Sequence, residues 1–375
     1  MASRWCSPAC GTSATDAGSG VITVGMLLAG FALLVGGADL LVRGAARLAA
    51  ASGLSPLVIG LTVVAVGTSA PELATSIGAA LSGSPDIALG NVIGSNIANV
   101  LLILGLTALI APLTVSQQLV RMDVPIMLGV SLLVFGLSLD GDLGRGEGIG
   151  LLALALAYVG LLLWLAKRQP HGDAGTQGDT VAPVWWRDAL YVLAGLALLV
   201  LGARWLVGGA VRIAELLGVS EMVIGLTVVA VGTSLPELAT SILATVRGQR
   251  DMAVGNIVGS CIFNLLLVLG ATAALSPTDI SVGPAVLRFD LPVMTAVALA
   301  CLPIFFTGFR VRRWEGALFV AYYIAYTAYL LLRSAHYHAL PAYSMVMMGF
   351  VVPLTAITLA LLAARAWRYQ RRRRA

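Results

Sequence analysis

Charged residues are scarce in this chain of 375 residues. Asp, Glu, Lys and Arg make up 11% of the sequence, hydrophobic residues make up 59%, and the mean hydropathy is +0.94. A soluble domain carries about 25% charged residues, so this composition excludes one. The apolar runs are about as long as a helix that crosses a bilayer, and they lack the alternation that a membrane barrel requires. We therefore expect an all-α polytopic membrane protein.

Histidine and cysteine are also rare. The three histidines, His171, His336 and His338, fall in predicted loops, and no Ser-His or His-His spacing suits an intramembrane hydrolase. The four cysteines have no metal-like spacing, although Cys6 and Cys10 could pair if the N-terminal segment lies outside the cell. We expect neither enzyme activity nor a cofactor.

Two polar runs interrupt the apolar segments and are copies of one another. The run GTSAPE at Gly67–Glu72 returns as GTSLPE at Gly232–Glu237, 165 residues later. The same offset carries the downstream polar residues Asn91, Ser95 and Asn99 onto Asn256, Ser260 and Asn264. Carboxylates at membrane depth are costly and by default mark an ion or substrate path. The duplication of a buried acid together with its polar neighbours is hard to explain by helix packing alone.

The proline within each run predicts a broken helix. Pro71 has no N–H for the carbonyl of Gly67, and it disfavours helical angles at Ala70. Such a break is tolerated at membrane depth where the freed carbonyls line a cavity, as in many transporters. A simple proline kink is the alternative, and the repeated polar neighbours of the proline argue against it.

A polar stripe follows each broken helix. Asn91, Ser95 and Asn99 are spaced at i, i+4 and share one helix face. Measured from the intervening turn, Glu72 and Asn99 lie at comparable depths of about 16 and 21 Å, at 1.5 Å per residue. The stripe alone is also compatible with hydrogen bonds between helices. Because the stripe is expected to face Glu72, we interpret it as the rest of a set of ion ligands.

The repeat organises the whole chain. We expect a disordered tail over 1–20, a five-helix repeat over 21–166, a cytoplasmic linker over 167–187, a second repeat over 188–333, and an extra transmembrane helix with an Arg-rich tail over 334–375. Five helices per half is an odd number, so the halves are expected to lie in opposite orientations. We expect short solvated loops between the spans, including residues 140–147.

Basic residues indicate the orientation. With the N-terminus outside and the C-terminus in the cytoplasm, most of the 23 Lys and Arg residues fall on the inner side, which favours a multi-pass protein of the inner (plasma) membrane. The arginine run at Arg371–Arg374 is typical of an anchor to anionic lipid rather than of nucleic-acid binding, because it follows a membrane exit. The sequence leaves the oligomeric state open.

These motifs resemble a known family. Residues Gly67–Glu72 with Gly90–Asn96, and Gly232–Glu237 with Gly255–Ser260, look like the two alpha-repeats of the calcium/cation antiporters, and they are most similar to the prokaryotic sodium/calcium exchangers. The resemblance covers about residues 21–333. It implies two inverted five-helix repeats, a ten-helix core in which spans one and six slide across the ion site. The extra C-terminal helix departs from that pattern.

The resemblance also implies an ion-binding role for particular residues. Glu72 and Glu237 would bind both calcium and sodium, and Thr68 and Thr233 would offer backbone carbonyls to calcium. Sodium would further use the hydroxyls of Ser69, Ser234, Ser95 and Ser260 and the carbonyls of Ala65 and Ala230. Asn99 and Asn264 would complete the central site.

The chemistry of these residues agrees with cation transport. Two carboxylates with neutral oxygen donors give a hard-oxygen shell of formal charge −2, which suits Ca²⁺. Two carboxylates close together in low dielectric resist simultaneous ionisation, so protons would compete with the metal. We therefore expect a secondary active antiporter that exchanges Ca²⁺ for Na⁺ by alternating access at a midplane site. Proton/calcium antiport is the main alternative, and a cation channel fits broken helices in inverted repeats less well.

Overall fold

The computed structural model describes residues 13–168, 185–217, 230–306, 308–334, 344–355, 357 and 364. Within these ranges, eight helices are long and apolar enough to cross a membrane, or up to nine if the bent pair Pro56–Thr68 and Ala70–Leu81 is one span. The start of the expected seventh span and part of the eleventh lie outside the described residues, as do the first part of the expected tail, most of the linker and the arginine run. The predicted helical, polytopic fold class is confirmed.

The first half contains nearly all of its expected spans as helical segments. In chain order its elements are α1 (Ser13–Ser52), α2 (Pro56–Ile59), the π-helix η1 (Gly60–Val64), α3 (Ala65–Thr68), α4 (Ala70–Leu81), α5 (Pro85–Ala98), the π-helix η2 (Asn99–Leu104), α6 (Gly105–Ile110), β1 (Leu113–Thr114), the π-helix η3 (Leu119–Asp123), α7 (Val124–Leu137), the 3₁₀-helix η4 (Ser138–Asp140), β2 (Asp142–Leu143) and α8 (Arg145–Arg168).

The second half repeats this order. Its described elements are α9 (Trp185–Leu216), α11 (Ala230–Gly232), α12 (Leu235–Val246), α13 (Arg250–Phe263), the π-helix η6 (Asn264–Val268), α14 (Leu269–Leu275), β3 (Ile280–Ser281), the π-helix η7 (Val286–Asp290), α15 (Leu291–Phe306), β4 (Arg310–Val311) and α16 (Arg313–Ser334), followed by the π-helix η8 (Met347–Val351).

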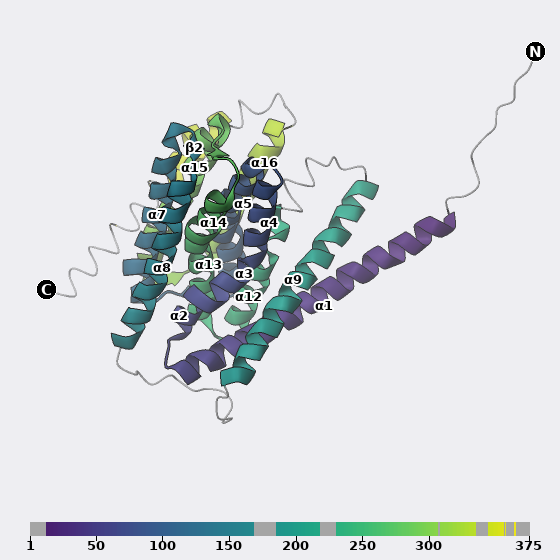
Figure 1. Cartoon of the computed structure of the whole chain (residues 1–375), viewed down its shortest axis with the longest axis horizontal. Helices are drawn as coiled ribbons and strands as arrows, with labels where there is room; N and C mark the ends of the chain where they lie inside the picture. Colours follow the sequence, from purple (N-terminus) through teal and green to yellow (C-terminus); the bar gives the residue numbers. More distant parts are fainter. Residues whose placement is uncertain are drawn as a thin grey trace, which may run out of the picture.

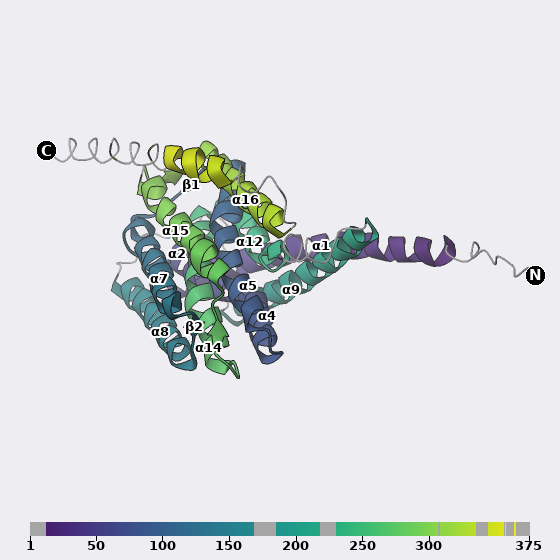
Figure 2. The same cartoon turned by 90° about the horizontal axis from the view of Figure 1, so that it is seen from above.

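The long helices α1 and α9 form an antiparallel pair on one flank of the bundle (Figures 1 and 2). They approach closely at glycines: a Cβ on Gly30 would lie 2.9 Å from the carbonyl oxygen of Gly202, and a Cβ on Gly37 would lie 2.8 Å from that of Gly195. Residue numbers rise along α1 as they fall along α9. Because α1 and α9 are equivalent in the repeat, equivalent helices of the two halves run in opposite directions.

The remaining contacts between the halves are also reciprocal. Gly105 on α6 packs against Gly316 on α16, and Gly270 on α14 packs in the same way against Gly148 on α8. The short strands follow the same rule, because β1 pairs with β4 while β2 pairs with β3, both antiparallel. This exchange of equivalent contacts is what an approximate two-fold axis between the halves produces.

The axis passes close to the centre of the bundle. Asn96 and Cys261 are equivalent residues that contact each other directly, since the Asn96 Nδ2 donates to the Cys261 carbonyl at 3.1 Å. Their helices, α5 and α13, are the most deeply buried candidate spans, whereas α8 and α16 expose most of their surface. In a membrane that exposed surface faces lipid, so α5 and α13 form the interior of the protein.

Two expectations about chain ends and loops need correction. α1 begins at Ser13, so residues 13–20 of the expected 1–20 tail are helical, and no proline lies in this stretch to interrupt the helix. Residues 140–147 are also more ordered than a solvated loop. β2 pairs there with β3, and the Glu147 Oε2 accepts the N–H of Gly144 at 2.8 Å, because a carboxylate at a helix N-terminus satisfies free backbone donors.

Candidate functional site

Both polar runs form broken helices, as predicted. Ser69 separates α3 from α4 with φ −80° and ψ 5°, and Ser234 separates α11 from α12 with φ −90° and ψ 8°. The two parts of the first broken helix meet at an angle of 41°. The break was expected at Ala70, which is instead already helical. The reason is that Pro71 occupies the first turn of α4, where its missing N–H costs nothing.

The acid at the end of each run lies in the first turn of the following helix. Glu72 and Glu237 are fully buried. The Ser69 hydroxyl donates to the Glu237 Oε1 at 3.2 Å, and the Ser234 hydroxyl donates to the Glu72 Oε1 at 3.3 Å. The two broken helices therefore meet, and each carboxylate is held by the serine of the opposite half. A helix N-terminus also favours negative charge at these positions.

An asparagine behind each carboxylate fixes the broken helix to the buried helix beside it. The Asn91 Nδ2 donates to the Ser76 Oγ at 3.0 Å and to the Glu72 carbonyl at 3.4 Å, and its Oδ1 accepts from the Thr233 hydroxyl at 3.5 Å. The equivalent bonds, made by Asn256 with Ser241, the Glu237 carbonyl and Thr68, measure 3.0, 3.5 and 3.2 Å. Each threonine therefore reaches across to the other half.

Asn91 was expected in the polar stripe that faces Glu72, and Asn256 is its copy in the second repeat. Their partners Ser76 and Ser241 were not singled out. A signal was available, because Ser76 lies one helical turn after Glu72 and its position relative to the acid is the same in both repeats. Such residues position the carboxylates rather than contribute a charge.

The expected carbonyl ligands lie on the segments that lead into each break. The Ala65 carbonyl accepts the Ser69 N–H at 3.0 Å and the Thr68 hydroxyl at 3.4 Å. Ala230 opens α11, the segment equivalent to α3. A backbone carbonyl has two lone pairs, so these two bonds already engage both lone pairs of the Ala65 oxygen, and a cation would have to displace the longer bond from Thr68. Coordination by the carbonyls of Ala65, Ala230, Thr68 and Thr233 stays a prediction.

Several buried polar atoms around the carboxylates have no hydrogen-bond partner in the described part of the chain. They belong to matching residues of the two halves: the second oxygen of Glu72 and of Glu237, the hydroxyls of Ser95 and Ser260, and the side-chain amides of Asn99 and Asn264. An unsatisfied buried polar group costs about 1–3 kcal/mol. Most of these atoms are hard oxygens, which are the donors that Ca²⁺ and Na⁺ take.

The helix geometry changes where the central amides lie. Asn99 opens the π-helix η2, and Asn264 opens the π-helix η6. The sequence predicted one regular helical stripe through Asn91, Ser95 and Asn99, so the π-turn was not foreseen. π-turns often occur at functional sites, although the described chain also contains them at η1, η3, η7 and η8. Their occurrence at equivalent asparagines of both halves fits a shared role.

Two further acids, the buried Asp123 and the half-buried Asp290, form a matching pair of hydrogen bonds away from Glu72 and Glu237. The Tyr158 hydroxyl donates to the Asp123 Oδ1 at 3.0 Å, and the Tyr326 hydroxyl donates to the Asp290 Oδ1 at 2.9 Å. These bonds connect α8 to η3 in the first half and α16 to η7 in the second. They are equivalent in the repeat, and they hold neighbouring spans together.

Comparison with known proteins identifies the family. The family model described as "Sodium/calcium exchanger protein" matches residues 22–164 and 188–332. The chain is 35% identical to the sodium/calcium exchanger MaX1 of Methanosarcina acetivorans over 299 residues, covering 70% of this chain and 85% of that protein. It is 39% identical over 237 residues to the inner membrane protein YrbG of Escherichia coli, covering 62% and 72%.

A solved structure agrees with these matches. The sodium-calcium exchanger NCX_Mj, soaked with 10 mM Na⁺ and no Ca²⁺, aligns with a TM-score of 0.71 and 34% identity over 82% of this chain and 99% of that chain. The family match falls on the two halves that carry the broken helices and their buried acids. The chain belongs to the sodium/calcium exchanger family of membrane antiporters.

Proposed function

We propose that this protein exchanges Ca²⁺ for Na⁺ across the membrane by alternating access. The observation that carries the proposal is the meeting of Glu72 and Glu237. Each is fully buried and bonded to a serine of the other half, and each has one oxygen without a hydrogen-bond partner among the described residues. Their combined formal charge of −2 balances one calcium ion or two sodium ions. If the same oxygen donors bind either Ca²⁺ or Na⁺, and the site opens to one side of the membrane at a time, the protein exchanges one cation for the other.

The remaining ligands follow from the same cluster. We assign hydroxyl and amide oxygens of Ser95, Ser260, Asn99 and Asn264 to the cations, because these buried atoms have no hydrogen-bond partner among the described residues. Ser69 and Ser234 hold the carboxylates and share in binding sodium. The antiparallel α1–α9 pair supports opposite orientation of the halves, in which the same two helices cover the site from either side.

Proton/calcium antiport is the second candidate. It is favoured by the carboxylates themselves, since two acids in one buried site bind protons when no metal balances their charge. Several broader features are also part of the proposal: the inner (plasma) membrane, an outer N-terminus, a cytoplasmic C-terminus and contact of the arginine tail with anionic lipid.

Calcium uptake by proteoliposomes tests the proposal. Vesicles loaded with Na⁺ are diluted into Na⁺-free choline medium that contains radioactive calcium, and a parallel sample carries a proton gradient without Na⁺. We expect uptake with the sodium gradient alone. Uptake driven only by the proton gradient would replace the proposal with the second candidate, and rapid non-saturable flux without a counter-ion would indicate a channel.

A further inference from the structure

An apolar cavity of about 420 Å³ lies between α9 and the broken helix of the first half. Gly67 and Ala70 form one wall, beside Ser69 of the proposed ion site. The other wall is the face of α9 with Leu196, Ala197, Val200 and Leu201. Arg204 is the one charged residue on this lining. The cavity therefore combines an apolar groove with a single guanidinium.

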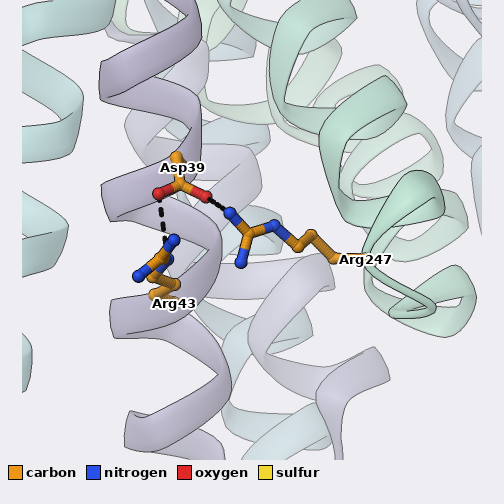
Figure 3. A network of polar contacts seen from close by, with 3 residues as sticks. All are labelled: Asp39, Arg43 and Arg247. Carbon is orange, nitrogen blue, oxygen red and sulfur yellow. Dashed lines mark hydrogen bonds and ion pairs between the residues drawn. The ribbon is translucent and has the colours of Figure 1, made fainter.

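The position equivalent to Arg204 in the first half is occupied differently. It is Asp39 on α1, and its carboxylate is neutralised within the protein (Figure 3). The Asp39 Oδ2 lies 2.9 Å from the Nε of Arg43, and its Oδ1 accepts a hydrogen bond from Arg247, which directly follows α12. The ion pair therefore ties α1 of the first half to the end of the broken helix of the second half.

The second half lacks the matching partners. The positions equivalent to Arg43 and Arg247 are Gly208 and Ser82, neither of which carries a charge. Arg204 is exposed, and within the described part of the chain no carboxylate forms an ion pair with it. Helix α1 is tied to the opposite broken helix by an ion pair, whereas α9 presents an exposed guanidinium beside an apolar cavity.

We propose that this cavity binds an anionic phospholipid, with an acyl chain between α9 and the broken helix and the phosphate on Arg204. Apart from Arg204, the lining is apolar, which suits a hydrocarbon chain, whereas a path for cations needs oxygen donors and no positive charge. Guanidinium and phosphate pair through two parallel hydrogen bonds. Trp205, next in sequence and 38% exposed, is of the type that lies at the headgroup level.

Such a lipid would contact the moving parts of the exchanger. Its chain would lie beside the point where α9 packs on Gly67, since a Cβ on Gly67 would lie 2.7 Å from the Leu196 side chain. Movement of α9 over the broken helix then requires the chain to shift or leave, so the lipid sets the rate of that step. This consequence for transport rests on the proposed function, but binding of the lipid does not.

Thermal unfolding of the purified full-length protein in detergent tests the binding. Dioleoyl phosphatidylglycerol is titrated against dioleoyl phosphatidylcholine, and the rise in Tm with lipid concentration gives an apparent affinity. We expect stabilisation by phosphatidylglycerol well above that by phosphatidylcholine. Arg204→Gln should weaken the apparent affinity for phosphatidylglycerol roughly fivefold, the effect of about one basic residue near anionic lipid.

Two further variants distinguish lipid binding in the cavity from a general attraction between basic residues and anionic lipid. Ala197→Trp fills the cavity while keeping the guanidinium, and this variant should also lose the greater stabilisation by phosphatidylglycerol than by phosphatidylcholine. Arg212→Gln removes an exposed charge from the same helix outside the cavity, and it should keep the preference. Equal stabilisation by both lipids, or an unchanged preference in Arg204→Gln, would overturn the proposal.

Two other results would assign the cavity to something else. A larger stabilisation by oleate than by phosphatidylglycerol would point to a free fatty acid. Faster calcium uptake by Arg204→Gln in vesicles of phosphatidylcholine alone would show that the guanidinium repels an incoming cation, and the cavity would then be an ion path. The unfolding assay uses no transport, so failure of lipid binding and failure of calcium exchange are distinguishable.

Discussion

Replacing one site carboxylate by its amide tests the ion site most directly. In Glu237→Gln the side chain keeps its size and an oxygen that accepts from Ser69 at the position now 3.2 Å away, so the contact between the halves survives. The formal charge of the site falls from −2 to −1. A bound calcium ion then carries one uncompensated charge in a fully buried site. The same reasoning applies to Glu72→Gln, whose amide faces Ser234.

The size of the effect follows from electrostatics. Two unit charges about 4 Å apart interact by about 4 kcal/mol at an effective dielectric constant of 20. At 1.4 kcal/mol per factor of ten, the loss weakens calcium binding by about a thousandfold. We therefore expect either variant to lose sodium-driven calcium uptake at micromolar calcium while remaining folded and monodisperse in detergent.

A matched control is available in the same protein. Asp123→Asn also converts a fully buried acid to its amide, but Asp123 is bonded to Tyr158 away from the carboxylate pair. Uptake should persist in this variant, with at most a loss of stability. Normal uptake in Glu237→Gln, or equal loss of uptake in Asp123→Asn and Glu237→Gln, would refute the placement of the ion site.

Three other predictions concern helix packing, topology and ion selectivity. Gly37→Ala should destabilise the protein by about 1–3 kcal/mol, because its Cβ meets the backbone of α9 at 2.8 Å, whereas Gly36→Ala has open space and should leave Tm unchanged or raised. Cysteines at the equivalent turn positions Ser84 and Gln249 should label from opposite sides of the membrane, outside and inside respectively; same-side labelling would contradict inverted halves. Calcium uptake should need no potassium, because Asn264 is neutral and one calcium ion already balances the charge of the two carboxylates. Asn264→Asp should alter the potassium or pH dependence of uptake. A strict potassium requirement in the unmodified protein would contradict this role of Asn264.

The sequence predicted the features that repeat at a fixed offset. The duplication of GTSAPE and GTSLPE, the prolines and the acids identified two broken helices, and the structure brings Glu72 and Glu237 into one buried cluster. A repeated polar run at membrane depth has few explanations, because buried charge is costly. Pattern alone was therefore enough to identify these carboxylates as neighbours.

Details that depend on packing between the halves could not be predicted. The π-turns at Asn99 and Asn264 have no distinctive local sequence, and the two-residue strands exist only because they pair across the halves. The break falls at Ser69 rather than Ala70 because helix α4 begins one residue earlier than the effect of proline on its neighbour suggests. The strands depend on a tertiary contact, whereas the position of the break follows from Pro71 lying in the first turn of α4.

The reciprocal contacts make each half chemically incomplete. Ser69 satisfies Glu237, Ser234 satisfies Glu72, and β1 needs β4 as β2 needs β3. A polypeptide containing one half can meet these needs only by associating with a second copy inserted the opposite way up. The fold thus has the arrangement of an antiparallel dimer whose two subunits are joined in one chain. A substitution at Ser69 or Ser234 acts first on the carboxylate of the other half.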